Sequence, residues 1–202
     1  MGLASHQLQA LNRNGLSLYL IAVGCLLLGP WNPDGAELFE LSRSGLKGGE
    51  YWRFWTGQMV HSSWEHLALS LIGLILLQQM FGKELRTVVW IWGYAVISLV
   101  VGVCMLAFSR YGSFVGLSAI LHGLFAYAAC LAFRRDGLLA AGVLLVLGSK
   151  VIWEKLQGGS NFMEQLIGMP VAVDAHLYGF AAGLVLGAVM VASGSRLGQS
   201  AN

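Results

Sequence analysis

The stretch 174-DAHLYGFAAGLVLG-187 indicates how this chain folds. Three glycines, Gly179, Gly183 and Gly187, recur every four residues, so they form one ridge along a helix. Small residues at this spacing allow two membrane helices to approach each other closely. His176 lies on the same face as the ridge, so the helix that packs here also meets the histidine. The stretch therefore predicts a membrane helix in tight contact with a neighbour.

The composition of the whole chain also indicates a membrane protein. Of its 202 residues, 56 % are hydrophobic and 11 % are charged, whereas soluble domains carry about 25 % charged residues. The net charge is only +2, and no basic patch is interleaved with aromatic residues. We therefore expect the lipid bilayer as a partner, and no nucleic acid. The sequence predicts no oligomeric state.

Apolar segments follow one another along the chain. Their approximate ranges are 16–28, 64–81, 87–108, 116–133, 137–153 and 173–192. They lack the polar–apolar alternation of barrel strands, and several fall below the ~20 residues that span a bilayer squarely. We predict an all-α polytopic membrane protein, one domain over 1–202 that forms a six-transmembrane-helix bundle. The first segment is expected to be retained, because no small-residue cleavage site follows it.

The distribution of basic residues predicts the orientation. An even number of spans places both termini on one side of the membrane, and basic residues are densest in the short segments of that side. These residues are Arg13, Lys83, Arg86, Arg134, Arg135 and Arg196. We expect both termini in the cytoplasm, and the long loops at about 29–63 and 150–172 on the opposite face.

Histidines lie at or just inside the expected helix starts. They are His61, His66, His122 and His176. Ionisable groups at membrane depth are costly, so they are candidates for function. A hydrogen-bonded structural histidine is the alternative for His66.

Two helix starts carry capping signals. Ser62 and Glu65 have the spacing of a capping box, which would start a helix near Ser63. Asp174 is the expected N-cap of the last helix. Farther along the second helix, His66 and Ser70 are four residues apart and share a face, which indicates a polar cavity inside the bundle.

The stretch 116-GLS-118 opens the fourth segment and carries the candidate nucleophile. A serine hydroxyl reacts poorly until a base takes its proton, and His176 could do so from a neighbouring helix. The developing oxyanion needs hydrogen-bond donors, and the backbone N–H groups of Leu117 and Ser118 are free if they begin a helix. Gly116 would let that backbone turn sharply. His66 and Ser70 could add side-chain donors. By itself the serine between glycines could equally serve helix packing.

In these motifs the sequence resembles the rhomboid family of intramembrane serine proteases, over about residues 50–190. The resemblance begins with 52-WR-53 in the first long loop. His61, His66 and Ser70 follow the family's HxxxxHxxx pattern, which normally ends in asparagine. Gly116 to Ser118 match the GxS element, and 175-AH-176 with Gly179 and Gly183 match AHxxGxxxG.

The resemblance implies a site and an activity. Ser118 would be the nucleophile and His176 the general base, in a dyad without an acidic third member. His66 would help to bind the oxyanion, and His61 would tie the first loop to the helix end. The site would lie in a water-filled cavity open to the non-cytoplasmic face, and would hydrolyse a peptide bond in or near a substrate's transmembrane segment. No cofactor and no metal are implied.

Three positions depart from the usual family pattern. Ser70 replaces the asparagine, Ala119 replaces a glycine, and His122 stands where many rhomboids have a tyrosine that stacks on the catalytic histidine. GLSxxLHG with this histidine resembles the rhombosortase subfamily, which implies cleavage of Gly-Gly C-terminal sorting tails in Gram-negative bacteria, and so a bacterial inner membrane. We expect His122 to stack on His176 or to bond near it. The alternative is a packing histidine bonded to a backbone carbonyl.

Other functions fit the sequence less well. Four histidines in one cavity could bind zinc, but no HExxH motif is present and no acidic ligand stands at a useful spacing. An inactive rhomboid-like scaffold that binds membrane helices would typically have lost Ser118 or His176. A transporter would be expected to show an internal repeat or a pair of broken helices.

Overall fold

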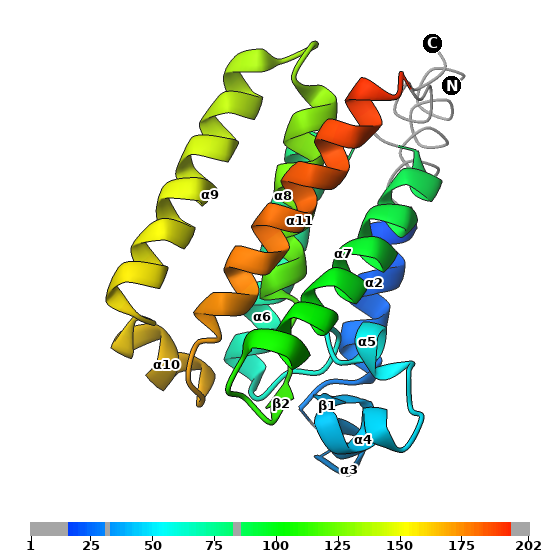
Figure 1. The fold of residues 1–202 in the computed structure, drawn as a ribbon, viewed down its shortest axis with the longest axis vertical. Coiled ribbons are helices and arrows are strands. Elements are labelled where there is room, and N and C mark those ends of the chain that lie inside the picture. Colours follow the sequence, from blue (N-terminus) through cyan, green and yellow to red (C-terminus); the bar gives the residue numbers. More distant parts are fainter. Residues whose placement is uncertain (1–15, 31–32, 83–85, 195–202) are drawn as a thin grey trace, which may run out of the picture.

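The computed structural model describes residues 16–30, 33–82 and 86–194, and over them the protein is mostly helical (Figure 1). The longer helices are α2 (Leu16–Leu27), α6 (Trp64–Phe81), α7 (Thr87–Phe108), α8 (Ser118–Ala132), α9 (Gly137–Gln157) and α11 (Val173–Ala192). The short helices are α3 (Pro33–Phe39), α4 (Arg43–Lys47), α5 (Arg53–Thr56) and α10 (Asn161–Ile167). The basic residues Arg13, Lys83 and Arg196 lie outside the described residues.

Each predicted segment overlaps one long helix, but the helices differ in length. Four of them, α6, α7, α9 and α11, are long and apolar enough to cross a membrane. The apolar helices α2 and α8 have only 12 and 15 residues. A mostly helical membrane protein is therefore confirmed, whereas six spans remain a prediction.

A small antiparallel sheet departs from the all-α prediction. Strand β1 (Leu41–Ser42) pairs with β2 (Ser113–Phe114), and Leu41 lies opposite Phe114. The Gly116 N–H also donates to the Gly57 carbonyl at 3.2 Å. These bonds join the first loop to the segment that leads directly into α8. The loop therefore holds the backbone from which Ser118 projects.

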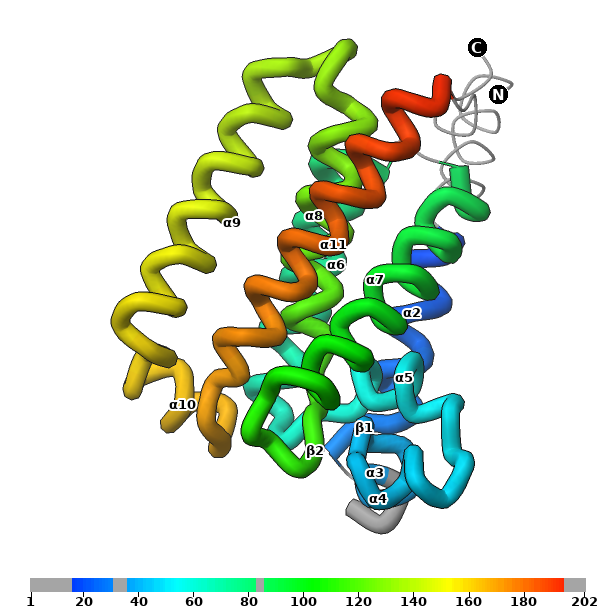
Figure 2. The backbone as a smooth tube through the Cα atoms, viewed as in Figure 1, coloured from blue at the N-terminus to red at the C-terminus, as the bar shows by residue number. Residues whose placement is uncertain are grey.

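Helix α8 lies at the centre of the bundle, and α11 packs closely along it (Figures 1 and 2). The predicted ridge makes this contact: Gly179 faces the backbone carbonyl of Ala119, and Gly183 faces that of Gly123. In lipid, association depends on close van der Waals packing rather than on the hydrophobic effect. The absence of side chains at both glycines therefore brings the start of α11 against the start of α8.

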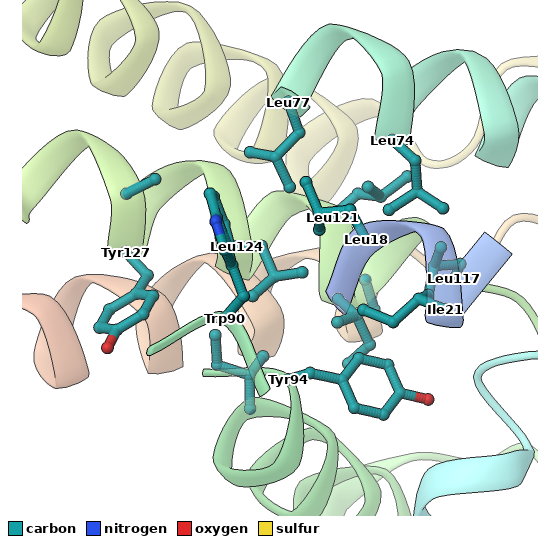
Figure 3. Packing of buried hydrophobic residues seen from close by; sticks show 14 of the residues in the cluster. Leu18, Ile21, Leu74, Leu77, Trp90, Tyr94, Leu117, Leu121, Leu124 and Tyr127 are labelled. Atoms are coloured by element: carbon teal, nitrogen blue, oxygen red, sulfur yellow. The ribbon is translucent and has the colours of Figure 1, made fainter. Parts of the chain in front are cut away.

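Large side chains fill the spaces around α8 (Figure 3). Leu117, which precedes this helix, and Leu124 and Tyr127 within it are fully buried, as is Trp90 of α7. Much of α9 stays exposed, and its outer face carries apolar and aromatic groups at Leu138, Leu145, Val146, Trp153 and Leu156. Such a face suits contact with lipid chains.

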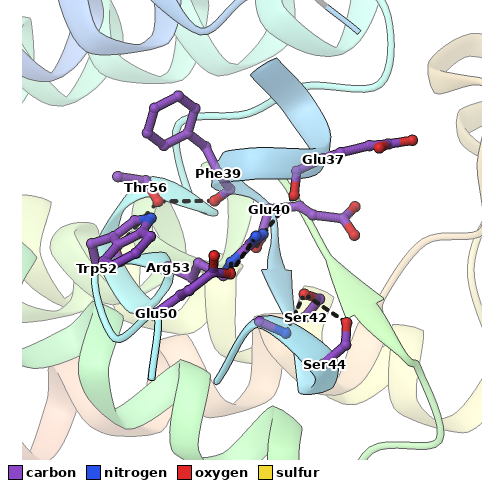
Figure 4. A network of polar contacts seen from close by, with 10 residues as sticks. Glu37, Phe39, Glu40, Ser42, Ser44, Glu50, Trp52, Arg53 and Thr56 are labelled. Carbon is purple, nitrogen blue, oxygen red and sulfur yellow. Dashed lines mark hydrogen bonds and ion pairs between the residues drawn. The ribbon is translucent and has the colours of Figure 1, made fainter. Parts of the chain in front are cut away.

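The first loop is held together by the buried guanidinium of Arg53 (Figure 4). It donates to the Glu37 carbonyl at 2.6 Å and to the Glu40 carbonyl at 2.9 Å, and it pairs with the Glu50 carboxylate. Five donors in a rigid fork allow one arginine to bind all three acceptors. The WR motif thus organises the loop that carries β1.

The helix ends differ from the capping predictions. Ser63, not Ser62, caps α6, because its hydroxyl accepts from the His66 N–H at 3.1 Å. Asp174 lies within the first turn of α11 and forms an ion pair with Lys155 of α9. The predicted loop at 150–172 is also wrong in part, since α9 continues to Gln157 and α10 follows. The apolar segment ends where charged residues begin, but helix α9 continues past them.

Candidate active site

The candidate site lies where the starts of α6, α8 and α11 meet the end of α9, at the lower end of the view in Figure 1. A cavity of about 800 Å³ opens there. Its lining includes residues from all four helices and from α10: His66, Ser118, His122, Glu154, Ile167 and His176. The first turns of α6, α8 and α11 each contribute a lining residue, and a helix N-terminus favours negative charge through its dipole.

Ser118 and His176 lie within hydrogen-bond distance. Ser118 is the first residue of α8 and His176 lies in the first turn of α11, and Ser118 Oγ is 2.9 Å from His176 Nε2. The glycine ridge explains the contact, since it brings the two helix starts together. A hydroxyl at this distance from an imidazole nitrogen has the geometry of an activated nucleophile.

An acidic residue that the sequence motifs do not include contacts the other side of His176. Glu154 Oε2 lies 2.8 Å from His176 Nδ1. The expected serine–histidine dyad therefore has an acidic side chain beside its histidine, which the sequence motifs did not predict. One signal points to it: Lys150 and Glu154 are charged residues four apart at the end of an apolar segment. Hydropathy places them in a loop, where no defined contact can be predicted.

His122 stacks on His176, with ring centroids 4.4 Å apart and an angle of 18° between the planes. Its Nδ1 also lies 2.7 Å from the Ser118 carbonyl oxygen. Both alternatives for this residue thus describe real contacts. Lys150 Nζ is 3.2 Å from His122 Nε2 and 2.6 Å from Glu154 Oε1.

Gly116 and His66 border the site on the side of α6. Gly116 has a φ of +109°, and a side chain there would collide with the His66 ring. A glycine is thus required at this turn both by conformation and by space. Leu117 is fully buried and directly precedes α8. The backbone N–H groups of Leu117 and Ser118 belong to the helix start, where no intrahelical acceptor exists.

The sequence profile of the rhomboid domain matches residues 48–193, which is most of the chain. The chain belongs to the rhomboid family. Members of this family are intramembrane serine proteases that act on membrane proteins in a bilayer. This rhomboid is accordingly an integral membrane protein. No curated protein matches its sequence.

His61 ties the first loop of this rhomboid to α6. Its Nδ1 is 2.9 Å from the Met59 carbonyl and its Nε2 is 2.9 Å from Ser70 Oγ. Because the carbonyl can only accept, Nδ1 carries the proton, and Ser70 must donate to Nε2. The single hydroxyl proton of Ser70 is thus engaged with His61 in this arrangement. That contact disfavours the predicted use of Ser70 as an oxyanion donor.

His66 contacts Ser62 rather than Ser70. Its Nδ1 accepts from the Ser62 N–H at 3.5 Å and lies 3.0 Å from Ser62 Oγ, which is also 2.8 Å from the Ile167 carbonyl oxygen. This chain of contacts attaches the start of α6 to the end of α10, and it holds the His66 ring beside Gly116. The predicted help of His66 to the oxyanion requires a proton on Nε2, the atom on the Gly116 side.

The buried His61 makes stability depend on pH. Burial, and secondly the charge of the neighbouring His66, lower the pKa of His61 from 6.5 to about 3. Below pH 6.5 the unfolded chain therefore binds a proton that the folded chain does not, so stability falls as the pH drops from about 6.5 toward 3. We expect the thermal unfolding midpoint in detergent to fall over this range, and less steeply in His61→Asn. Equal slopes for both proteins would contradict the assignment.

Three groups at the site also form a candidate metal-ligand set. The ligand atoms of His122, Glu154 and His176 lie within 4.8 Å of one another, and histidine and carboxylate are zinc ligands. A metal ion there would have to displace the Lys150 ammonium from Glu154 and His122. The same atoms are already paired, donor to acceptor, as a proton-transfer site requires.

Proposed function

We propose that this chain is an active serine endopeptidase, in which Ser118 is the nucleophile and His176 is the general base. The observation that carries the proposal is the 2.9 Å contact between Ser118 Oγ and His176 Nε2, inside a cavity that is large enough for an extended peptide segment. Helix packing alone does not explain why a serine and a histidine at the starts of two different helices contact each other. An inactive scaffold would not need this contact.

The proposed reaction proceeds in two halves. Ser118 Oγ bonds to the carbonyl carbon of the scissile peptide while its proton moves to His176 Nε2. The C–N bond then breaks, and the leaving amine takes the proton from Nε2. Water, or another nucleophile with a proton to lose, attacks the acyl ester and gives its proton to Nε2. Ser118 recovers a proton as the ester bond breaks.

The oxyanion is proposed to lie beside the start of α8. The N–H groups of Leu117 and Ser118 donate to it, the α8 dipole favours its charge, and a protonated His66 Nε2 adds a third donor. We assign Ser70 to the support of His61 instead, because of their 2.9 Å contact. Gly116 contributes through its conformation, which lets the His66 ring approach.

For the substrate we propose Gly-Gly C-terminal sorting tails, as in rhombosortases. The support is the GLSxxLHG stretch and the position of His122, whose ring lies flat on His176. The proposal includes a bacterial inner membrane with both termini in the cytoplasm and the cavity open to the periplasm. The alternative is a general rhomboid protease with other membrane substrates.

A cleavage reporter distinguishes between these two proposed classes of substrate. We expect co-expression with a secreted reporter that ends in a Gly-Gly motif, a membrane helix and basic residues to yield cleavage. The matched control replaces Gly-Gly with Leu-Leu in the same reporter, and cleavage is expected to fall at least about tenfold, because side chains at both positions occupy space that the glycines leave free. Equal cleavage of both reporters would remove rhombosortase and leave the general protease. Cleavage that persists in Ser118→Ala would overturn the proposed chemistry.

A further inference from the structure

Glu154 faces two partners at once, one on each carboxylate oxygen. Oε2 is 2.8 Å from His176 Nδ1, and Oε1 is 2.6 Å from Lys150 Nζ. The side chains of Glu154 and His176 are only 16 % and 8 % exposed, so their contact is shielded from water. A carboxylate can only accept, so Nδ1 must carry the proton. Nε2 is then the unprotonated nitrogen, free to take the proton of Ser118.

Lys150 closes the network on its far side. Its ammonium can only donate, so His122 Nε2, 3.2 Å away, must accept. His122 Nδ1 therefore carries the proton that the Ser118 carbonyl accepts at 2.7 Å. Both bonds keep the ring neutral and hold it parallel to His176. The contacts form a closed circuit through α8, α9 and α11: Ser118, His176, Glu154, Lys150 and His122.

From this circuit, and given the proposed function on which it rests, we infer that Glu154 is a positioning residue for His176. Lys150 holds Glu154 and His122 in place, so α9 completes the site. The carboxylate selects the tautomer of His176 that can accept a proton. It also stabilises the imidazolium that forms when Ser118 attacks, as the aspartate does in a serine–histidine–aspartate triad.

A merely structural ion pair would look different. Lys150 and Glu154 are four residues apart on α9, and such a surface pair needs only one carboxylate oxygen. The second oxygen is directed at His176 instead. The chain also provides the structural version of the same link: Lys155 of α9 pairs with Asp174 of α11. That pair joins the same two helices and touches neither Ser118 nor His176.

The test compares Glu154→Gln with Asp174→Asn in the full-length protein. Each substitution removes one carboxylate that links α9 to α11, but only the first acts on His176. We expect Glu154→Gln to lower kcat on the order of 10²-fold or more with KM little changed, and to slow labelling of Ser118 by a fluorophosphonate probe to a similar degree. Asp174→Asn should change neither rate by more than about twofold, since a surface ion pair contributes little. The thermal midpoints of the two variants should be similar.

Conservative variants distinguish the effect of the negative charge of Glu154 from the effect of its side-chain length. Glu154→Asp retains the carboxylate and should be more active than Glu154→Gln, which retains the length. Lys150→Gln should have an intermediate rate, because it loosens Glu154 and His122 without removing the carboxylate. Activity of Glu154→Gln within about twofold of the native protein, or Glu154→Asp less active than Glu154→Gln, would overturn the inference. An equal loss of Ser118 labelling in Asp174→Asn would also overturn the inference. If Ser118→Ala retained turnover, the proposed function would fail instead.

Discussion

Replacement of Ser118 with alanine is expected to lower kcat by roughly 10⁴- to 10⁶-fold, to the level that substrate binding and oxyanion donors alone support. The hydroxyl is the group 2.9 Å from His176 Nε2, and it is the group placed to form the acyl ester. The fold should persist, because Ser118 starts α8 and contributes no side-chain cap to it. Reporter cleavage and fluorophosphonate labelling measure the loss.

The control for Ser118→Ala is Ser98→Ala. Ser98 is a fully buried serine of α7 outside the cavity lining, so its replacement should leave both readouts unchanged. His176→Ala should be as inactive as Ser118→Ala, and the double variant no worse, because two residues that act as a unit do not add. Independent, additive losses at the two positions would argue against their joint action.

The second large effect is expected from a single methyl group on the glycine ridge. An alanine Cβ at Gly183 would overlap the backbone carbonyl of Gly123, and one at Gly179 would overlap that of Ala119. A side chain can rotate away from an intruding atom, but a helix backbone cannot, so α11 must move off α8. We expect Gly183→Ala to lower the free energy of unfolding by about 3 kcal/mol or more, and to abolish labelling of Ser118.

Gly142→Ala is the matched control for the ridge. Gly142 lies within α9, and apart from its chain neighbours and the local helix backbone no atom of the described residues lies within 4 Å of the position that a Cβ would occupy. The same chemical change there should be neutral or stabilise the helix by up to about 1 kcal/mol. Denaturant titration in detergent compares the two variants. If Gly183→Ala unfolds at the same concentration as Gly142→Ala, the contact between α8 and α11 is looser than described.

Local patterns in the sequence are sufficient to predict the long helices and the approach of Ser118 to His176. Hydropathy alone predicts where the long helices lie, because each must be apolar in lipid. The four-residue glycine spacing predicts the close contact of α11 with a neighbour. His176 lies on that ridge and Ser118 lies at another helix start, so their approach is predictable from the sequence alone.

Such local patterns do not predict the contacts between side chains of different helices and loops. Nothing in the local sequence of Ser70 shows that its one proton is donated to His61, nine residues earlier in the chain, because that bond depends on the path of the first loop. The stacking of His122 on His176 likewise depends on where α11 crosses α8, whereas its bond to the Ser118 carbonyl lies within α8. Two alternatives for one residue, stacking and a backbone hydrogen bond, prove to be compatible.

What the sequence by itself determined is the family, the helical membrane architecture and the candidate nucleophile and base. These follow from composition, period and motif, which are properties of neighbouring residues. Only the tertiary structure determined which side chain contacts Nδ1 of His176. Hydropathy ends α9 near Trp153 because charge follows, yet the helix continues and turns Glu154 toward α11, where its carboxylate meets Nδ1 at 2.8 Å. Helix packing determines which group pairs with a buried charge, and no local stretch of the sequence specifies that packing.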